Sequence, residues 1–216
     1  MRIEKITAKE AKEFLLPRHY AGRTPSISFA YGWKDDGGIL KAVLTIGKPV
    51  SPSLCKGICG EKYKANVYEL NRLCREEDFN KPLSQLVSYA LKDLKPKNLI
   101  IVSYADTAMH HVGYIYQACS FHYTGMTKPR TDIWTGKHSR HYTREQQQSD
   151  TRVYRSAKHR YVYFCTDKRT KKEMLKALAY PILPYPKGES EHYKLGEYLK
   201  PKLVKSKKQA GLQGIH

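Results

Sequence analysis

The sequence predicts an α/β fold in which helices flank a mixed central sheet. Two patterns indicate this: a β-hairpin signal over residues 27–47, and a strand, helix, strand order over residues 67–104. A length of 216 residues suits one domain with extensions, and 40% hydrophobic residues are enough for a buried core. We therefore expect a single globular body.

The first elements follow from local signals. Apolar positions at helical spacing over residues 6–16 predict a short helix that ends at Pro17, and a polar loop follows. Residues 27–47 alternate β-branched and aromatic residues on both sides of Asp35-Asp36-Gly37-Gly38, which predicts the hairpin. Residues 48–65 are rich in Pro, Ser, Gly and Lys, so we expect a loop there.

The middle of the chain predicts a parallel crossover. Residues 67–74 suit a strand, residues 81–94 an amphipathic helix, and residues 98–104 a buried strand. This order brings the two strands together side by side in the same direction. Regular alternation along the first strand predicts that Leu70 and Arg72 share one face.

The remainder alternates short elements with polar segments. In order, we expect a helix at 110–119, strands at 121–125 and 131–135, a polar stretch at 137–157, a strand at 161–165 and a basic helix at 171–179. From Tyr180 onward the chain is rich in Pro and Lys and is expected to be extended. We predict one domain over residues 1–188 and a basic, partly disordered tail over residues 189–216.

The charge balance indicates a polyanionic partner. The chain has 39 Lys and Arg against 20 Asp and Glu, a formal net charge of +19. Nucleic acid is the usual partner of such a chain, although a solvated basic surface has the same composition. The sequence has no apolar run long enough to span a membrane and no hydrophobic signal core, and its five cysteines are an odd number. We expect a cytoplasmic protein with reduced thiols and no membrane partner.

Several longer stretches carry a family resemblance, in the same order along most of the chain. They are Arg18-His19-Tyr20, Tyr68-Glu69-Leu70-Asn71-Arg72-Leu73, Ser103-Tyr104-Ala105-Asp106, Gly113-Tyr114-Ile115-Tyr116-Gln117-Ala118, Phe121-His122-Tyr123-Thr124-Gly125, His159-Arg160-Tyr161-Val162-Tyr163-Phe164 and Tyr185-Pro186-Lys187-Gly188. Through them the sequence resembles the phage Mom family of DNA-modification proteins. The element order also resembles the GNAT acyltransferase fold, in which two parallel strands splay apart to form a cleft.

The resemblance implies an enzyme that acts on adenine in double-stranded DNA. It implies addition of a carbamoylmethyl group to adenine N6, which protects phage DNA from host restriction. Because N6 is hydrogen-bonded inside the duplex, the adenine must be extruded before it reacts. A small-molecule donor must supply the group, and the sequence does not identify the donor or the residues that bind it.

One segment departs from the usual GNAT pattern. Ordinary GNAT enzymes hold the coenzyme A pyrophosphate on the backbone amides of a glycine-containing loop. Here the corresponding segment, residues 75–82, reads Arg-Glu-Glu-Asp-Phe-Asn-Lys-Pro, which is acidic and lacks glycine. The use of acetyl-CoA in the ordinary manner is therefore not expected.

Three polar side chains are candidate ligands of an iron ion. His19 and Tyr20 are adjacent in a polar loop, and Asp106 comes just after a buried strand, where α/β proteins present site residues. Imidazole, phenolate and carboxylate together suit iron, and an iron-binding role is also what the Mom resemblance implies. The competing interpretations are a surface or capping histidine for His19 and a helix N-cap for Asp106.

Four residues are candidates for catalysis: Arg72, Ser103, Asp106 and Tyr116. Arg72 interrupts an apolar strand, so it either clamps an anionic donor or phosphate, or pairs with Glu69 or Asp106. Tyr116, on the helix expected at 110–119, either stacks on an extruded base or packs in the core. Ser103, near the end of a buried strand, is a further candidate for the same cleft.

Two rival functions use the same sequence features. A coenzyme A-dependent N-acetyltransferase of another amine requires a coenzyme A loop, which residues 75–82 do not resemble. A non-enzymatic nucleic-acid-binding protein accounts for the charge, but it gives no purpose to the candidate residues above.

Overall fold

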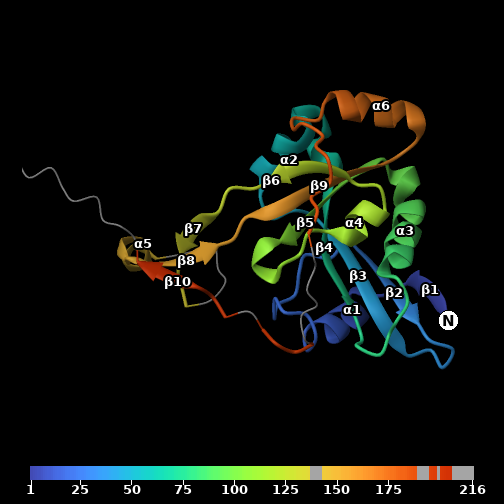
Figure 1. Ribbon diagram of the computed structural model, residues 1–216, viewed down its shortest axis with the longest axis horizontal. Coiled ribbons are helices and arrows are strands. Elements are labelled where there is room, and N and C mark those ends of the chain that lie inside the picture. The colour runs from blue at the N-terminus through green and yellow to red at the C-terminus, as the bar shows by residue number, and fades with distance from the viewer. Residues whose placement is uncertain (137–142, 189–194, 199, 206–216) are drawn as a thin grey trace, which may run out of the picture.

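A seven-stranded mixed sheet forms the centre of the molecule (Figure 1). The computed structural model describes residues 1–136, 143–188, 195–198 and 200–205. The strand order is β1-β2-β3-β4-β5-β9-β6. The bounds are β1 Arg2–Lys5, β2 Phe29–Lys34, β3 Leu40–Gly47, β4 Val67–Arg75, β5 Leu99–Asp106, β6 His122–Met126 and β9 Lys158–Cys165.

The β4 and β5 strands run parallel, while the other neighbouring pairs of this sheet are antiparallel. Their pairing runs from Val67 opposite Ile100 to Leu70 opposite Ser103. Both strands continue past this point without pairing with each other, so they splay apart at their carboxyl ends. The sheet and its splayed parallel pair confirm the predicted α/β, GNAT-like fold class.

Helices cover both faces of the sheet. Neighbouring residues of one strand reach opposite faces: Val43 packs in the cluster under α1, and Leu44 packs in the cluster under α3. One face carries α3 and α4, and the other carries α1, α2 and α6. The bounds are α1 Ala8–Leu15, α2 Pro52–Cys59, α3 Leu83–Leu94, α4 Tyr114–Ala118 and α6 Lys168–Lys176. None of the helices in the described residues is long and apolar enough to cross a membrane.

A second, three-stranded sheet projects from the body (Figure 1). It consists of β7 (Arg130–Ile133), β8 (Thr151–Arg155) and β10 (Leu203–Lys205), in the order β10-β8-β7. A short helix, α5 (Arg144–Gln148), precedes β8. The β10 strand comes from the segment predicted to be a tail, which therefore contributes to a folded sheet. The domain boundary at residue 188 stays a prediction.

Most of the predicted elements are confirmed, and the differences have local causes. The hairpin appears as β2 and β3, and the crossover as β4, α3 and β5. The loop expected over residues 48–65 was wrong, because Ser51 caps a helix that has Pro at its first position. The strands β1 and β8 were not expected, since both are short and polar.

The helix expected over residues 110–119 is shorter than predicted. Two residues in left-handed backbone conformation, His110 (φ 51°) and Gly113 (φ 83°), interrupt the helical path before Tyr114. Tyr116 lies in the first turn of this short helix. Its ring lies against Phe121 and Tyr161, at centroid distances of 5.5 Å and 5.3 Å.

The expectation that Leu70 and Arg72 share a face was also wrong. Thr45 pairs with Arg72 and Ile46 pairs with Leu70, so Asn71 is an extra residue in β4. Directly paired residues share a face, and Thr45 and Ile46 point to opposite faces. The bulge at Asn71 therefore puts Leu70 in the core and turns Arg72 to the other face.

Candidate active site

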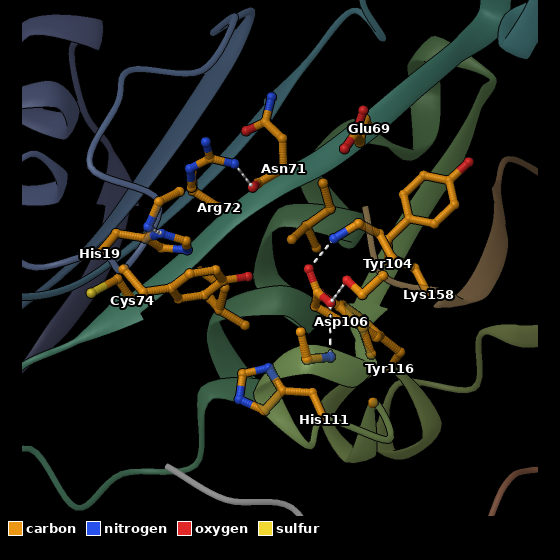
Figure 2. Close-up of a pocket in the computed structure, with 18 of the residues that line it drawn as sticks. His19, Glu69, Asn71, Arg72, Cys74, Tyr104, Asp106, His111, Tyr116 and Lys158 are labelled. Atoms are coloured by element: carbon orange, nitrogen blue, oxygen red, sulfur yellow. Dashed lines mark hydrogen bonds and ion pairs between the residues drawn. The ribbon is translucent and has the colours of Figure 1, made fainter. Parts of the chain in front are cut away.

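A cleft of about 1410 Å³ opens where β4 and β5 diverge. Figure 2 shows Arg72 beside His19 on the β4 side, and Asp106 with Lys158 on the β5 side. The polar and aromatic residues that line its centre are His19, Tyr20, Glu69, Asn71, Arg72, Tyr104, Asp106, His111, Tyr116 and Lys158. The structure thus brings together all the predicted site residues except Ser103, which lies behind this surface.

His19 reaches the cleft because α1 ends just before it. Its backbone N–H still donates to the Leu15 carbonyl at 2.9 Å, and its Nδ1 accepts from the Ala21 N–H at 3.1 Å. The side chain is 5% exposed and stacks on Tyr20, with ring centroids 4.3 Å apart. Burial and the charges of Arg72 and His111 lower the pKa of His19 to about 3, so the imidazole is neutral at physiological pH.

Tyr20 lies between His19, His111 and Asp106. Its ring meets His111 edge to face at a centroid distance of 6.4 Å. Burial, together with the negative charge of Asp106, raises the pKa of Tyr20 to about 12. The phenol therefore keeps its proton and can donate a hydrogen bond into the cleft.

Asp106 ends β5 and is held from three directions. Its Oδ1 accepts from the Ala108 N–H at 3.0 Å and from the Ser156 hydroxyl, and its Oδ2 forms an ion pair with Lys158. Burial opposes ionisation, but the hydrogen bonds from Lys158 and Ser156 outweigh it and lower the pKa of Asp106. Asp106 also caps the short 3₁₀ turn at Thr107–Met109, so the capping role exists, for a different element than expected.

Arg72 lies at the β4 bulge. Its Nη1 donates to the Asn71 carbonyl at 2.6 Å, and Asn71 is fixed in turn by the Thr45 hydroxyl at 2.7 Å. The positive charge of Arg72 helps to lower the pKa of His19, after the larger effect of burial. The guanidinium thus supplies a fixed positive charge on the β4 wall.

Tyr116 lines the inner wall of the cleft, and Ser103 lies behind that wall. Burial raises the pKa of Tyr116 to about 12, while a hydrogen bond with Ser103 acts in the opposite direction. Ser103 is fully buried, and its hydroxyl donates to the Leu70 carbonyl at 2.9 Å. This hydroxyl joins β4 to β5 at the last paired position before the strands diverge, so Ser103 positions other groups rather than facing the cleft.

Lys158 and Ser156 are the main site residues that the sequence did not indicate. Lys158 is the residue directly opposite Asp106 in the antiparallel β5–β9 pair, and Ser156 precedes it by two positions. Both lie in or beside a polar stretch with no pattern of its own. The register of β5 against β9 is the signal that finds them, and it requires knowing that these distant strands pair.

The cleft mouth is bordered by basic side chains. They are Arg23, Arg75, Lys128, Arg130, Arg155, Lys200 and Lys202. They come from the loop after His19, the end of β4, the segment between β6 and β7, the small sheet and the C-terminal segment, which are far apart in sequence. The mouth is therefore suited to a polyanion, whereas the centre combines Arg72 and Lys158 with two carboxylates and several aromatic rings.

The three candidate iron ligands lie near one another, but their present contacts favour other roles. Asp106 is already bonded to an ammonium, a hydroxyl and an amide, and Tyr20 is held in its neutral form. The described residues contain no group of three His, Cys, Asp or Glu side chains arranged to hold a metal ion. Tyr20 is not among these residue types, so iron binding by His19, Tyr20 and Asp106 stays a prediction.

The acidic segment over residues 75–82 forms part of the cleft wall. Glu76 pairs with Arg18 at 2.7 Å, and Asp78 pairs with Lys41 at 3.1 Å. Phe79 is buried against Trp33, with a centroid distance of 5.0 Å. These contacts fix the segment beside the first turn of α3 and neutralise two of its three carboxylates, and the segment has no glycine with which to form the backbone cradle of a coenzyme A loop.

Similar solved structures are acetyltransferases. An N-acetyltransferase from Staphylococcus aureus Mu50 is 12% identical, and the similarity covers 76% of this chain and 98% of that chain with a TM-score of 0.47. An acetyltransferase from Bacillus subtilis in complex with CoA is 17% identical, with coverages of 76% and 97% and a TM-score of 0.43. A GNAT superfamily phosphinothricin acetyltransferase from Sinorhizobium meliloti, in complex with AcCoA, is 10% identical, with coverages of 76% and 87% and a TM-score of 0.47.

Comparison of sequences gives a family. No curated protein matches the chain. A family model described as the Mom protein family matches residues 1–187, a segment that includes the whole centre of the cleft. The match indicates the broad class of a DNA-modifying transferase, as the resemblance of the separate stretches implied. Since residues 1–187 make up most of its 216 residues, the chain belongs to the Mom protein family.

Proposed function

We propose that this protein transfers a carbamoylmethyl group to adenine N6 in double-stranded DNA and thereby protects phage DNA from host restriction. The observation that carries the proposal is the meeting of Arg72, Tyr20, Asp106 and Tyr116 in one cleft with a basic mouth. Family membership supports DNA modification as the broad activity. The particular product is the part that requires an experiment.

Capture of DNA begins at the basic mouth. Lysine and arginine side chains there neutralise phosphates and release counterions, without reading sequence. The adenine then leaves the stack and enters between aromatic rings, with Tyr20, His111 and Tyr116 as the side chains available for stacking. The paired rings of His19 and Tyr20 give this wall a fixed orientation.

The proposed chemistry forms one N–C bond, and it breaks the bond between the methylene carbon and the leaving group together with one N–H bond. The adenine N6 lone pair attacks the methylene carbon of the carbamoylmethyl group, the bond to the donor's leaving group breaks, and its electron pair leaves with that group. One N6 proton is released. Asp106, kept ionised by Lys158 and Ser156, accepts a hydrogen bond from N6–H and directs that proton toward solvent.

Arg72 has the complementary role. A donor with an anionic leaving group develops negative charge as its bond breaks, and a fixed guanidinium on the opposite wall stabilises that charge. The absence of glycine from residues 75–82 argues against acetyl-CoA bound in the ordinary GNAT manner. The donor proposed is therefore a small anionic molecule with an electrophilic carbamoylmethyl group.

The proposal is tested by mass spectrometry of nucleosides from cells that express the chain. DNA from cells with wild-type protein should yield deoxyadenosine carrying one added carbamoylmethyl group, and this DNA should resist restriction endonucleases. Asp106→Asn, which keeps a capping oxygen, should yield none, while Asp36→Asn, which changes an exposed carboxylate far from the cleft, should match wild type. Unmodified DNA from cells containing folded wild-type protein would overturn the proposal.

The two rival functions give different results in the same samples. An ordinary N-acetyltransferase would bind coenzyme A in a titration and leave adenine unchanged. A nucleic-acid-binding protein would bind duplex DNA with a normal salt dependence and also leave adenine unchanged. Only the transferase proposed here produces a new adenine species that depends on Asp106.

A further inference from the structure

The small sheet β7–β8–β10 takes no part in the bond-forming step described above, yet it supplies Arg130 and Arg155 to the mouth of the cleft. We define the arm as this sheet together with residues 200–202. Its described residues carry six basic side chains and one acidic one, Asp132. Figure 1 shows the arm projecting from the body on the side opposite α3. The seven-stranded sheet and its helices already form a core without the arm, so the arm calls for an explanation other than packing.

The register of the arm separates its two faces. On one face, Arg130 pairs with Arg155, and Asp132 pairs with Val153. Asp132 bridges the two arginines at 3.1 Å and 2.9 Å, which fixes that face as a salt-bridged support. This face contributes Arg130, Asp132, Val153 and Arg155 to the cleft wall.

The other face carries Arg152, Tyr154 and the adjoining Lys202. The Tyr154 N–H donates to the Lys202 carbonyl at 2.8 Å, and the Lys202 ammonium lies 5.3 Å from the centre of the Tyr154 ring. Tyr154 is 38% exposed, and Lys200 and Lys202 are exposed as well. Aromatic rings placed among cations, on an exposed sheet, are typical of nucleic-acid surfaces.

This face is continuous with the cleft. Tyr154, Lys200 and Lys202 border the mouth through which a base would enter. An extruded base stays attached to its own backbone, so the phosphates on either side of it must lie at that mouth. We propose that the arm face formed by Arg152, Tyr154, Lys200 and Lys202 docks on the phosphate backbone of duplex DNA beside the target base. This assignment rests on the proposed function, for which it names the DNA-binding surface.

The test is the salt dependence of binding to a short fluorescent duplex DNA, measured by fluorescence anisotropy. The arm variant combines Arg152→Gln, Lys200→Gln and Lys202→Gln. Each phosphate contact contributes roughly 0.9 to the slope of log affinity against log salt concentration, so the slope should fall by about 2 to 3. A charge-preserving variant, Arg152→Lys with Lys202→Arg, should keep the wild-type slope.

The α6 helix supplies a matched control. Lys168→Gln, Arg169→Gln and Lys172→Gln together remove the same charge from a basic helix that does not line the cleft. Its slope should equal that of wild type. An equal fall of the slope in the arm and α6 variants, or an unchanged slope in the arm variant, would overturn the proposal. Binding of anionic vesicles or duplex RNA with the same dependence on the arm would overturn the assignment to DNA.

A second measurement uses wild-type protein, so that an unfolded variant cannot decide the result. Acetylation of lysines by a soluble reagent, followed by mass spectrometry, should show DNA protecting Lys200 and Lys202 but not Lys168 or Lys172. Equal protection of both groups would contradict the arm assignment. The proposed function fails in a different measurement, since its failure is the absence of modified adenine in the nucleoside analysis. That result does not depend on what the arm binds.

Discussion

At the scale of single residues, Asp106 combines a structural and a chemical role. It caps the turn after β5, and it also holds Lys158 and Ser156 at the cleft. The carboxylate is 8% exposed, so its substitution cannot be as harmless as that of a surface residue. Any test of its chemistry must therefore keep its shape.

The first prediction compares Asp106→Ala with Asp106→Asn. Both should abolish adenine modification, because neither retains a carboxylate. The Ala variant loses the cap and should be destabilised by about 1 kcal/mol or more, whereas Asn keeps a capping oxygen. Nucleoside mass spectrometry and thermal unfolding measure the two effects. Full activity in the Asn variant would show that Asp106 is a cap alone.

The second prediction concerns iron. If His19, Tyr20 and Asp106 bind iron, purified wild-type protein should contain iron that is lost in His19→Ala and in Tyr20→Phe. Elemental analysis by mass spectrometry measures it, with unfolding temperatures as the control for folding. If all three proteins contain the same amount of iron, His19 and Tyr20 are not iron ligands. The neutral imidazole and phenol would then have stacking and hydrogen-bonding roles.

The third prediction is a pH dependence of stability that comes from His19. Burial lowers the pKa of His19 to about 3, from 6.5 in the unfolded chain. Between these values the unfolded chain binds a proton and the folded protein does not, so stability falls as pH falls from about 6.5 toward 3. The loss is at most about 1.4 kcal/mol per pH unit.

The measurement for this prediction is denaturant unfolding of wild type and His19→Gln across that pH range. The pKa values of His122 and His159 are also lowered by burial, so the wild-type slope has several sources. The difference between the two proteins isolates His19. If the free energy of unfolding depends on pH in the same way in both proteins, His19 binds a proton as readily in the folded state as in the unfolded chain.

The residue scale also shows what sequence reasoning could reach. The resemblance singled out His19, Tyr20, Arg72, Asp106 and Tyr116, and the fold brings all five to one cleft. It missed Lys158, whose contact with Asp106 spans 52 positions and depends on the register of two distant strands. Local patterns report faces and caps, but they do not report long-range register.

At the scale of elements, strong local patterns were sufficient and weak ones were not. The hairpin has a turn signal with flanking β-branched residues, and α3 has a clear apolar face, so both were predicted. The bulge at Asn71 leaves no comparable signal. It depends on Thr45 and on the Ser26 carbonyl, which accepts from the Asn71 side chain at 2.8 Å. Tertiary contacts of this kind override alternation.

The fourth prediction tests how tightly α4 is fixed. A Cβ at Gly113 would lie 2.5 Å from the Tyr161 ring, and the residue has a φ of +83°. Gly113→Ala should therefore cost about 2 to 4 kcal/mol, from overpacking added to backbone strain, and should disturb Tyr116. Gly136→Ala is the matched control, since its φ is +78° but nothing lies within 4 Å.

The control variant should lose only the backbone contribution of about 1 to 2 kcal/mol. Thermal unfolding compares the two proteins, and adenine modification should fall further in Gly113→Ala than in Gly136→Ala. Equal unfolding temperatures would mean that the Tyr161 ring moves aside at little cost. The position of Tyr116 would then owe nothing to the close contact between Gly113 and that ring.

At the scale of the whole molecule, the C-terminal segment connects parts that are distant in sequence. The Gly196 N–H donates to the Arg18 carbonyl at 3.2 Å, and the Tyr198 hydroxyl donates to the Leu16 carbonyl at 3.0 Å. Farther along, Leu203 pairs with Val153 of β8. The segment thus runs from the end of α1, beside the His19 loop, to the arm. From sequence it was expected to be a dispensable tail with Lys200, Lys202, Lys205, Lys207 and Lys208, of which the last two lie outside the described residues.

The last prediction compares two truncations of this segment. Ending the chain after Gly188 removes Lys200, Lys202 and the β10 strand, so binding of duplex DNA should weaken more at low salt than at high salt, and the slope of log affinity against log salt should flatten. It should also lower the unfolding temperature, because the contacts with α1 and β8 are lost. Ending the chain after Lys205 keeps every one of these contacts, so it should retain the unfolding temperature and most of the slope. If both truncated proteins bind DNA with the wild-type slope, the C-terminal segment does not touch DNA, and the phosphate contacts must come from Arg23, Lys128, Arg130 and Arg155 of the remaining mouth.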